Sequence, residues 1–557
     1  MSVASTDFRT RCLHSLVKVF ADEELAAQAY ARGTSLGNEA FSFQVAYRSE
    51  WLRRGIRAEA DSPVADRISL RSVGLVPSDF PARDDHDDDI LRTAPGLYPD
   101  PLLPLDGIDG LHAPPNQWRS VWVTVDPGER PLPAGVYPIR IGFFSEEGEA
   151  LGDAAFELEV IPALLPEQKL LHYEWLHFDC LATYYRVPVF SERHWELLEN
   201  YVREAVRYGI NTFLTPIVTP PLDTAIGGER PTVQLVDIEK AGDGYRFGFD
   251  KLQRWVDLCN RCGASRFEFS HLFTQWGAKH APKIIAKENG VEKRIFGWET
   301  DATGEEYRTF LDRFLPELNR FIRENGLERR SIFHVSDEPE PHDFEAYRQA
   351  KEIIARHLEG YPIMDALSDY QFYETGLVER PIPSSDHIGP FLDNEVPDLW
   401  TYYCNAQQRK VANRMFSMPS RRGRVIGLQL YKFGLAGFAH WGYNFWYTRY
   451  ATRPIDPYRV TDAGMGFPSG DSHLVYPGED GHPVGSIRLE TLREALQDLR
   501  ALQLYESFAG KEAAVALLED GLEQPITFAD YPRDDEWFLS FRERLNRGLL
   551  QWVAPKQ

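Results

Sequence analysis

Several features that define common protein classes are scarce or absent in this sequence of 557 residues. No hydrophobic run approaches the roughly 20 residues of a membrane-spanning helix. The first residues, MSVASTDFRTRCLHSLVKVF, lack the apolar core and the small-residue cleavage site of a signal peptide. The chain has only 5 cysteines, an odd number for a protein large enough to fold without disulfides: Cys12, Cys180, Cys259, Cys262 and Cys404. We therefore expect reduced thiols and a cytoplasmic protein.

Positive charge is also in deficit. The chain has 61 Lys and Arg residues against 84 Asp and Glu residues, a formal net charge of −23, and no basic cluster. Nucleic acids and anionic membranes are bound by basic surfaces, so neither is expected as a partner, and a neutral or cationic ligand fits better. No G-x-G-x-x-G follows a predicted strand, and no cofactor is expected. The oligomeric state stays open, a homo-oligomer included.

The first 165 residues have the pattern of strands separated by turns. Segments 40–49, 117–128 and 134–144 are rich in β-branched and aromatic residues. In the second of these, Val121, Val123 and Val125 share one face and Trp122 and Thr124 the other. Acidic and proline-rich residues between the strands are typical of a solvated loop. The pattern predicts an N-terminal β-sandwich domain, residues 1–165, which the stretch IPALLPEQK connects to the next domain.

From residue 166 onward, short apolar runs alternate with long amphipathic helices. Predicted helices at 191–209, 249–263, 305–326 and 343–360 each end at a glycine, and Ser191 is expected to cap the first. Alternating strands and helices predict a parallel sheet. Eight candidate strands are counted, at 170–179, 210–217, 265–273, 331–338, 361–369, 386–391, 399–405 and 435–445. Residues 166–557 are therefore predicted to form a (β/α)8 TIM barrel with C-terminal helices, an α/β fold.

The fourth predicted strand, in SIFHVSDEPEPHDF, ends in two adjacent carboxylates, Asp337 and Glu338. The active sites of such barrels lie at the C-terminal ends of the strands. Neighbouring side chains of a regular strand point to opposite sides, so both carboxylates can reach one ligand only where the regular pleat of the strand is interrupted. Pro339 is expected to cause that interruption and to hold Glu338 in an extended conformation. Two close carboxylates do not ionise easily together, which yields a proton donor beside an anion. A pair of this kind is typical of glycosidases. The alternative interpretation is that a loop begins here and that Asp337 caps the helix that follows.

Aromatic and polar residues at the other strand ends are candidates for sugar binding. Aromatic faces stack on the C–H faces of sugars, but only about half of a strand's aromatics can face the pocket. The aromatic candidates are Trp175, Trp276, Tyr402, Tyr403, Trp441, Tyr443 and Trp446. The polar candidates include the loop after the second strand and are Asp179, Asp223, Glu229, Arg230, His271, Asn405 and Asn444.

The sequence resembles glycoside hydrolase family 123 and the wider set of bacterial proteins that share its catalytic domain. The resemblance lies in SDEP at 336–339, in residues 399–447 and in SIRLETLREALQDL at 486–499. It implies an exo-acting, retaining enzyme for β-linked N-acetylgalactosamine or a related hexosaminide. It also implies substrate assistance, in which the 2-acetamido oxygen attacks the anomeric carbon, Asp337 orients and stabilises that group, and Glu338 is acid and then base. Residues 215–236 match only a subgroup of these relatives.

Three alternatives remain at this point. A retaining glycosidase for a sugar without an acetamido group would need a protein nucleophile, for which Asp179, Asp223, Asp365 and Asp369 are candidates. The seventh strand segment carries no carboxylate and argues against one there. A metal-dependent barrel hydrolase would use His177 and Asp179 with His271 or His334. A non-catalytic carbohydrate-binding protein would have no need of the paired carboxylates. The pair Cys259 and Cys262 has zinc-ligand spacing but no second pair, and no metal is expected.

Overall fold

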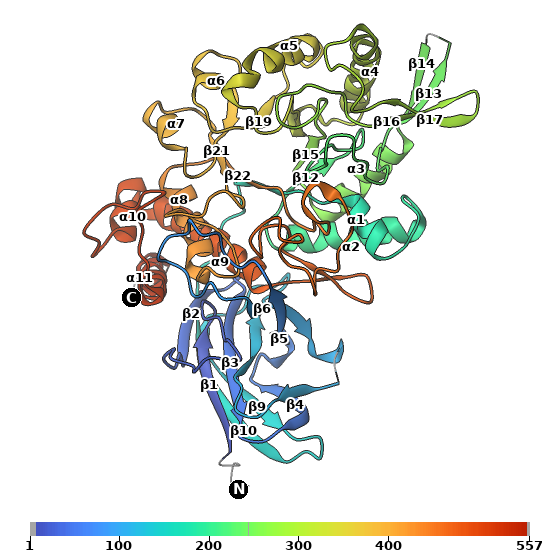
Figure 1. The fold of residues 1–557 in the computed structure, drawn as a ribbon. Coiled ribbons are helices and arrows are strands. Elements are labelled where there is room, and N and C mark those ends of the chain that lie inside the picture. Colours follow the sequence, from blue (N-terminus) through green and yellow to red (C-terminus); the bar gives the residue numbers. More distant parts are fainter. Residues whose placement is uncertain (1–6, 108, 243, 554–557) are drawn as a thin grey trace.

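The computed structural model describes residues 7–107, 109–242 and 244–553, and the protein is of the mixed α/β type (Figure 1). The N-terminal part consists of two five-stranded sheets. The first has the order β1 (Phe8–His14), β3 (Phe41–Ser49), β8 (Arg119–Val125), β5 (Ile68–Ser78), β6 (Gly96–Pro104). The second has the order β2 (Arg32–Leu36), β10 (Ala150–Ile161), β9 (Gly135–Phe144), β4 (Arg53–Asp61), β7 (Leu111–Ala113).

Strand β8 shows why these sheets pack as they do. Val121, Val123 and Val125 lie in a core that also contains residues of β9 and β10, so one face of β8 meets the second sheet. Trp122 points to the opposite face, into a small hydrophobic cluster with Val73, Leu102 and Ile487, the first residue of α9 (Ile487–Ala509). The predicted alternation is confirmed. Both faces are buried because the first sheet is covered on its outer side by α9.

Among the described residues that follow, eight strands form two sheets in which all pairing is parallel. Six form one sheet, in the order β18 (Ser331–Ile332), β15 (Arg266–Phe269), β12 (Thr212–Thr215), β11 (Leu171–Glu174), β22 (Gly437–His440), β21 (Trp400–Tyr402). The other two, β19 (Met364–Ala366) and β20 (Arg380–Ile382), pair with each other. Isolated parallel bridges join Phe333 to Ile363 and Ser384 to Tyr402. Pairing therefore passes through all eight strands, and the ends of the six-stranded sheet are linked through β19 and β20.

One of the eight predicted strands was wrong. Residues 386–391 do not form a strand, and the helix α7 (Gly389–Asp393) begins there instead. The sixth strand is β20, a few residues earlier, and contains Pro381. Prolines at 381 and 383 gave this segment the appearance of a loop, because proline lacks the N–H of a ladder hydrogen bond.

The predicted helices are present around these strands. They are α2 (Glu192–Arg207), α3 (Asp250–Cys262), α4 (Glu305–Glu324) and α5 (Phe344–Ala355), and the expected C-terminal helices are α9, α10 (Lys511–Leu518) and α11 (Asp535–Val553). A further helix, α8 (Ser420–Lys432), was not predicted. The Ser191 hydroxyl accepts a hydrogen bond from the His194 amide and caps α2, as expected. Short helices α1 (Phe178–Tyr184) and α6 (Gln371–Glu374) follow β11 and β19. None of the helices among the described residues is long and apolar enough to cross a membrane.

A small four-stranded sheet was not predicted. Its order is β14 (Gly244–Gly248), β13 (Asp237–Ala241), β16 (Ile284–Glu288), β17 (Val291–Phe296), and Figure 1 shows it projecting from one side of the parallel strands. Its hairpins are inserted after β12 and after β15. The expected loop at 215–236 leads directly into β13.

Buried polar contacts join the two N-terminal sheets to the helical part. The Arg488 guanidinium on α9 donates two hydrogen bonds to Asp100 on β6, at 2.8 and 2.9 Å. Arg71 on β5 donates to Glu490 on α9 at 2.6 Å. All of these groups except Arg71 are fully buried, so the charges depend on each other across the contact.

Candidate active site

A cavity of about 310 Å³ lies at the C-terminal ends of the parallel strands. Its walls are side chains at the ends of β11, β19, β21 and β22 and in the segments after β11, β18, β21 and β22. Loops at 222–223, 275–276 and 449–450 form its rim. Both adjacent carboxylates line it. The lining residues are Tyr173, Trp175, Leu222, Asp223, Gln275, Trp276, Asp337, Glu338, Ala366, Tyr402, Cys404, Asn405, Ala439, His440, Trp441, Arg449, Tyr450 and Phe467.

The backbone at Glu338 explains how neighbouring carboxylates reach one cavity. Its φ is +44°, in the left-handed region, so the expectation that Pro339 holds it extended was wrong. The Trp276 amide donates to the Asp337 carbonyl at 2.9 Å, and the Glu338 amide donates to the Ala366 carbonyl at 3.1 Å. These bonds, to the loop after β15 and to the last residue of β19, hold a conformation that a residue before proline normally avoids. Backbone strain of this kind is concentrated at functional sites.

The electrostatics of the pair favour one proton shared by two carboxyl groups. Burial and the nearby Glu338 charge raise the pKa of Asp337 well above its ordinary value. Burial also raises the pKa of Glu338, while the Tyr402 hydroxyl, which donates to Glu338 Oε1 at 2.5 Å, opposes that rise. A proton donor and an anion therefore lie side by side in the cavity.

The predicted aromatic residues divide between the cavity and the core. Trp175, Trp276, Tyr402 and Trp441 line the cavity, and Trp276 is 38% exposed at the rim. Tyr403, Tyr443 and Trp446 are buried away from it: Tyr403 packs against Phe438 and His440, and Tyr443 and Trp446 against Tyr201. Sequence reasoning missed Tyr173, Tyr450 and Phe467. Tyr173 was detectable, because it is two residues before Trp175 and shares its face of the strand.

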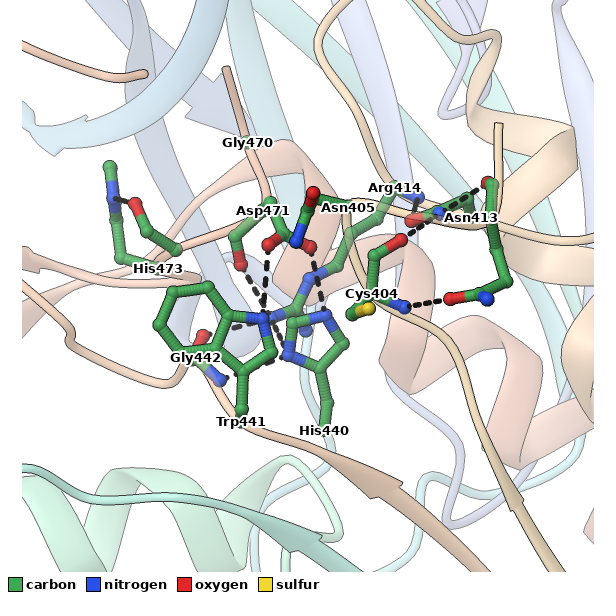
Figure 2. Close-up of polar contacts among 12 residues, drawn as sticks. Cys404, Asn405, Asn413, Arg414, His440, Trp441, Gly442, Gly470, Asp471 and His473 are labelled. Atoms are coloured by element: carbon green, nitrogen blue, oxygen red, sulfur yellow. Dashed lines mark hydrogen bonds and ion pairs between the residues drawn. The ribbon is translucent and has the colours of Figure 1, made fainter. Parts of the chain in front are cut away.

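A buried polar network supports the wall that Trp441 and His440 form (Figure 2). Asp471 accepts a hydrogen bond from Trp441 Nε1 at 3.0 Å and faces His440 Nε2 at 3.5 Å. Arg414 donates to His440 Nδ1 at 2.7 Å and to Glu174 at 2.8 Å. Burial raises the pKa of Asp471 to about 7. Neither Asp471 nor Arg414 was predicted, since both lie in loops without regular structure.

The loop after β12 contributes less to the cavity than predicted. Asp223 lines it, and its Oδ2 accepts a hydrogen bond from the Tyr450 amide at 2.8 Å. Arg230 is buried outside the cavity, where it donates to both oxygens of Asp179 at 2.7 and 2.9 Å. Glu229 lies on the surface in ion pairs with Lys283 and Arg294. The structure therefore separates Asp179, Glu229 and Arg230 from the lining residues.

Three further residues predicted to bind substrate, Asn405, His271 and Asn444, each contact other groups of the protein. Asn405 lines the cavity, and its Oδ1 accepts a hydrogen bond from Arg83. His271 is buried beneath the wall, stacked on His334 with ring centroids 4.5 Å apart. Asn444 is buried and binds the His177 backbone at both its carboxamide atoms. Only Asn405 of these is in position to touch a ligand.

The metal site considered at His177 and Asp179 holds an arginine instead. The Arg230 guanidinium lies 3.0 Å from His177 Nδ1 as well as on Asp179. The Arg230 guanidinium supplies the positive charge that a metal would bring, so Arg230 and Asp179 form an internal ion pair. Asp369, another candidate nucleophile, caps the Gln371 amide at 2.8 Å and is not a lining residue.

Comparisons with known proteins bear on the family and the fold of the chain. The family model for the glycoside hydrolase 123 catalytic domain matches residues 175–505. A family 123 glycoside hydrolase from Clostridium perfringens, studied for glycolipid glycan hydrolysis, aligns with a TM-score of 0.75 and 15% identity over 98% of each chain. At that identity it shows a shared fold.

Other solved structures align more weakly. An FMN-binding β-glucuronidase from Facaelibacterium prausnitzii has a TM-score of 0.34 and 11% identity, over 84% of this chain and 61% of the other. A family 5 mannosidase from Rhizomucor miehei has a TM-score of 0.36 and 12% identity, over 65% of this chain and 97% of the mannosidase. No curated protein matches the sequence. The family model spans more than half of the chain and includes the paired carboxylates, and the chain therefore belongs to glycoside hydrolase family 123.

Proposed function

We propose that this glycosidase is a retaining, exo-acting enzyme that removes β-linked N-acetylgalactosamine, or a related hexosaminide, by substrate-assisted catalysis. The observation that carries the proposal is the left-handed backbone at Glu338, which brings two adjacent carboxylates to one cavity. A sugar that supplies its own nucleophile needs only an acid/base group and a group that stabilises the acetamido cation. The pair provides both.

In this mechanism Glu338 donates its proton to the glycosidic oxygen as the bond from that oxygen to the anomeric carbon breaks. The 2-acetamido oxygen forms the new bond to the anomeric carbon, which gives a cyclic oxazolinium and releases the aglycone as an alcohol. Asp337, as an anion, accepts the acetamido N–H and balances the positive charge. Water then attacks the anomeric carbon as its bond to the acetamido oxygen breaks, Glu338 accepts the proton of the water, and the acetamido group is restored. Each step inverts the anomeric carbon, so the configuration is retained overall.

The positions of the other carboxylates support substrate assistance over a protein nucleophile. Among the described lining residues, Asp223 is the only carboxylate besides the pair. It lies on a rim loop, held by the Tyr450 amide, and burial raises its pKa to about 6, which makes it a weaker nucleophile at acidic pH. Asp223 is thus the residue on which the alternative mechanism, for a sugar without an acetamido group, depends.

We also propose that the eight parallel strands form a closed (β/α)8 barrel within residues 166–557, preceded by a β-sandwich domain at 1–165. The bridges at Phe333 and Ser384 support closure, because they connect β19 and β20 to both ends of the six-stranded sheet. In such a barrel the site lies at the C-terminal strand ends, where the cavity is found. Aromatic walls and the Trp276 rim suit a sugar and the start of its aglycone.

Two inhibitors test the mechanism. A thiazoline that mimics the oxazolinium should bind more tightly than substrate, as transition-state-like species do, whereas a 2-deoxy-2-fluoro glycoside should not label the protein. Aryl glycosides matched in all but the 2-acetamido group give the substrate class, with turnover expected only when it is present. Covalent labelling of a peptide that contains Asp223, with no inhibition by the thiazoline, would refute substrate assistance.

A further inference from the structure

The loop between β5 and β6, residues 79–95, has the acidic composition of a solvated loop but is bound to α8. The guanidinium of Arg422, in the first turn of α8, donates to both carboxylate oxygens of Asp87, at 2.7 and 3.0 Å. Arg421, also in that turn, donates to the carboxylate of Asp89. The Arg422 side chain is fully buried, so its charge depends on Asp87. The expectation of a solvated loop was therefore wrong for this part of it.

One cation of the same loop reaches the wall of the cavity. Arg83 Nη2 donates a hydrogen bond to Oδ1 of Asn405, which follows β21 and lines the cavity. Asp84 and Asp85 come directly after Arg83 in the sequence, yet its partner is a neutral amide. Figure 2 shows Asn405 beside Asp471, in the supporting network of the cavity wall. A residue of the N-terminal part of the chain thus contacts a lining residue of the site.

This contact fixes the orientation of the Asn405 amide. A guanidinium has donors and no acceptor, so the amide atom that it meets is the oxygen. The amide nitrogen, Nδ2, carries two N–H groups, and no hydrogen bond joins it to another described residue. A cation on the amide oxygen also polarises the group, which makes its N–H groups stronger donors. The cavity wall therefore has an oriented N–H donor at Asn405.

We propose that Arg83 is a positioning residue of the active site, which holds the Asn405 amide so that Nδ2 donates a hydrogen bond to a hydroxyl of the bound sugar. The inference rests on the proposed function, in which an N-acetylhexosamine occupies the cavity. In that mechanism Asp337 binds the acetamido group at C2, and Glu338 acts on the oxygen at C1. The hydroxyls at C3, C4 and C6 are the ones left for Asn405.

The alternative is that Arg83 only fastens the loop. The loop has other fastenings, because Asp87 and Asp89 bind the two arginines of α8, and the Leu91 amide donates to the Ser417 carbonyl at 2.6 Å. These contacts stay in place when Arg83 is replaced. A structural role predicts a lower Tm and unchanged kinetics, whereas a positioning role predicts altered kinetics with little change in Tm.

The first experiment compares kcat/KM of Arg83→Met, Asn405→Ala and the double variant on an aryl β-N-acetylgalactosaminide. Loss of one hydrogen bond to the substrate should lower kcat/KM by about three- to tenfold in each single variant. The double variant should lose no more than Asn405→Ala, because Arg83 acts through the amide. Arg83→Lys keeps a cationic donor and should recover most of the loss.

Two further variants separate positioning from stability. Asn405→Asp offers Arg83 a carboxylate, which binds a guanidinium more strongly than an amide does, but it has no N–H for the sugar. We expect Tm at or above the wild-type value and kcat/KM as low as in Asn405→Ala. Arg92→Met is the control, since Arg92 lies in the same loop and binds Asp22 and Glu23 at 2.9 and 3.0 Å. It should lower Tm and leave kcat/KM unchanged.

The 3-, 4- and 6-deoxy forms of the substrate identify the hydroxyl. For one of them, Arg83→Met should cause no further loss of kcat/KM, because the acceptor of the hydrogen bond is already missing. Wild-type kinetics in Arg83→Met, a loss that adds to that of Asn405→Ala, or an equal further loss with all three deoxy substrates would overturn this inference alone. A wild-type protein that cleaves no N-acetylhexosaminide would overturn the proposed function and this inference together.

Discussion

The buried Arg230 provides a prediction that the structure makes quantitative. Replacement with Met keeps an apolar side chain against Phe445 and Tyr447, whose ring centroids lie 5.5 and 5.3 Å from the guanidinium carbon. It removes two hydrogen bonds to Asp179, one to the Leu222 carbonyl and one to His177 Nδ1. Because Asp179 is fully buried, its charge would be left without compensation, which typically costs about 3–5 kcal/mol.

The decrease in the free energy of unfolding can be measured by urea unfolding monitored by tryptophan fluorescence, and Tm provides a second measure. A second variant, Arg230→Met with Asp179→Asn, removes the orphaned charge and should recover roughly 1–3 kcal/mol, the coupling expected of residues in contact. Arg294→Met is the matched control. Arg294 pairs with Glu229 on the surface, where such pairs contribute about 0–1 kcal/mol.

Kinetics decide whether Arg230 has any direct part in substrate binding. We expect KM to stay within a few fold of the wild-type value at a temperature where the variant is folded, because Arg230 does not line the cavity. Arg230→Met with wild-type stability and a large increase in KM would refute this reasoning. It would mean that the guanidinium leaves Asp179 and reaches the substrate.

Three further predictions concern the carboxylate pair. Glu338→Gln keeps the hydrogen bond from Tyr402 but removes the transferable proton. We expect kcat to fall by ~10²–10⁴ for glycosides with poor leaving groups and by less for dinitrophenyl glycosides, whose leaving group needs no proton. A change in kcat below about threefold for both kinds of substrate would exclude Glu338 from catalysis. Asp337→Asn should lower kcat while Tm is kept; the reverse pattern would indicate a structural cap. Tyr402→Phe removes the hydrogen-bond donor that stabilises ionised Glu338, and this raises the pKa of Glu338. Because the protonated form of Glu338 then persists to higher pH, the basic limb of the kcat/KM profile should move upward by ~0.5–1 pH unit. A basic limb that does not move would contradict this.

Local patterns in the sequence were enough to predict much of the fold. The strands β3, β8 and β9 and the helices α2, α3, α4 and α5 were predicted from periodicity, because burial on one face imposes it. The cap at Ser191 was predicted for the same kind of reason, since it depends on residues within one turn. Strand β20 was not, because its prolines carry a local signal for a loop that pairing with β19 overrides.

The site was predictable at the strand ends and less so in the loops. Asp337, Glu338, Trp175, Tyr402 and Trp441 follow strands whose pattern fixes their place. The left-handed conformation of Glu338 depends on hydrogen bonds to the loop after β15 and to the end of β19, which no local pattern records. Arg230 meets Asp179 across 51 positions of sequence, and nothing in either segment indicates its partner.

The buried ion pairs between the first N-terminal sheet and α9 bear on how such proteins evolve. Arg488 is fully buried, and its carboxylate partner, Asp100, belongs to the N-terminal part of the chain. An N-terminal region taken from another protein would have to bring a carboxylate to the same place, or leave a guanidinium buried without a counterion. We therefore expect the two parts to be exchanged together, so that a chimera which replaces Asp100 but keeps Arg488 should be less stable than one that transfers both residues.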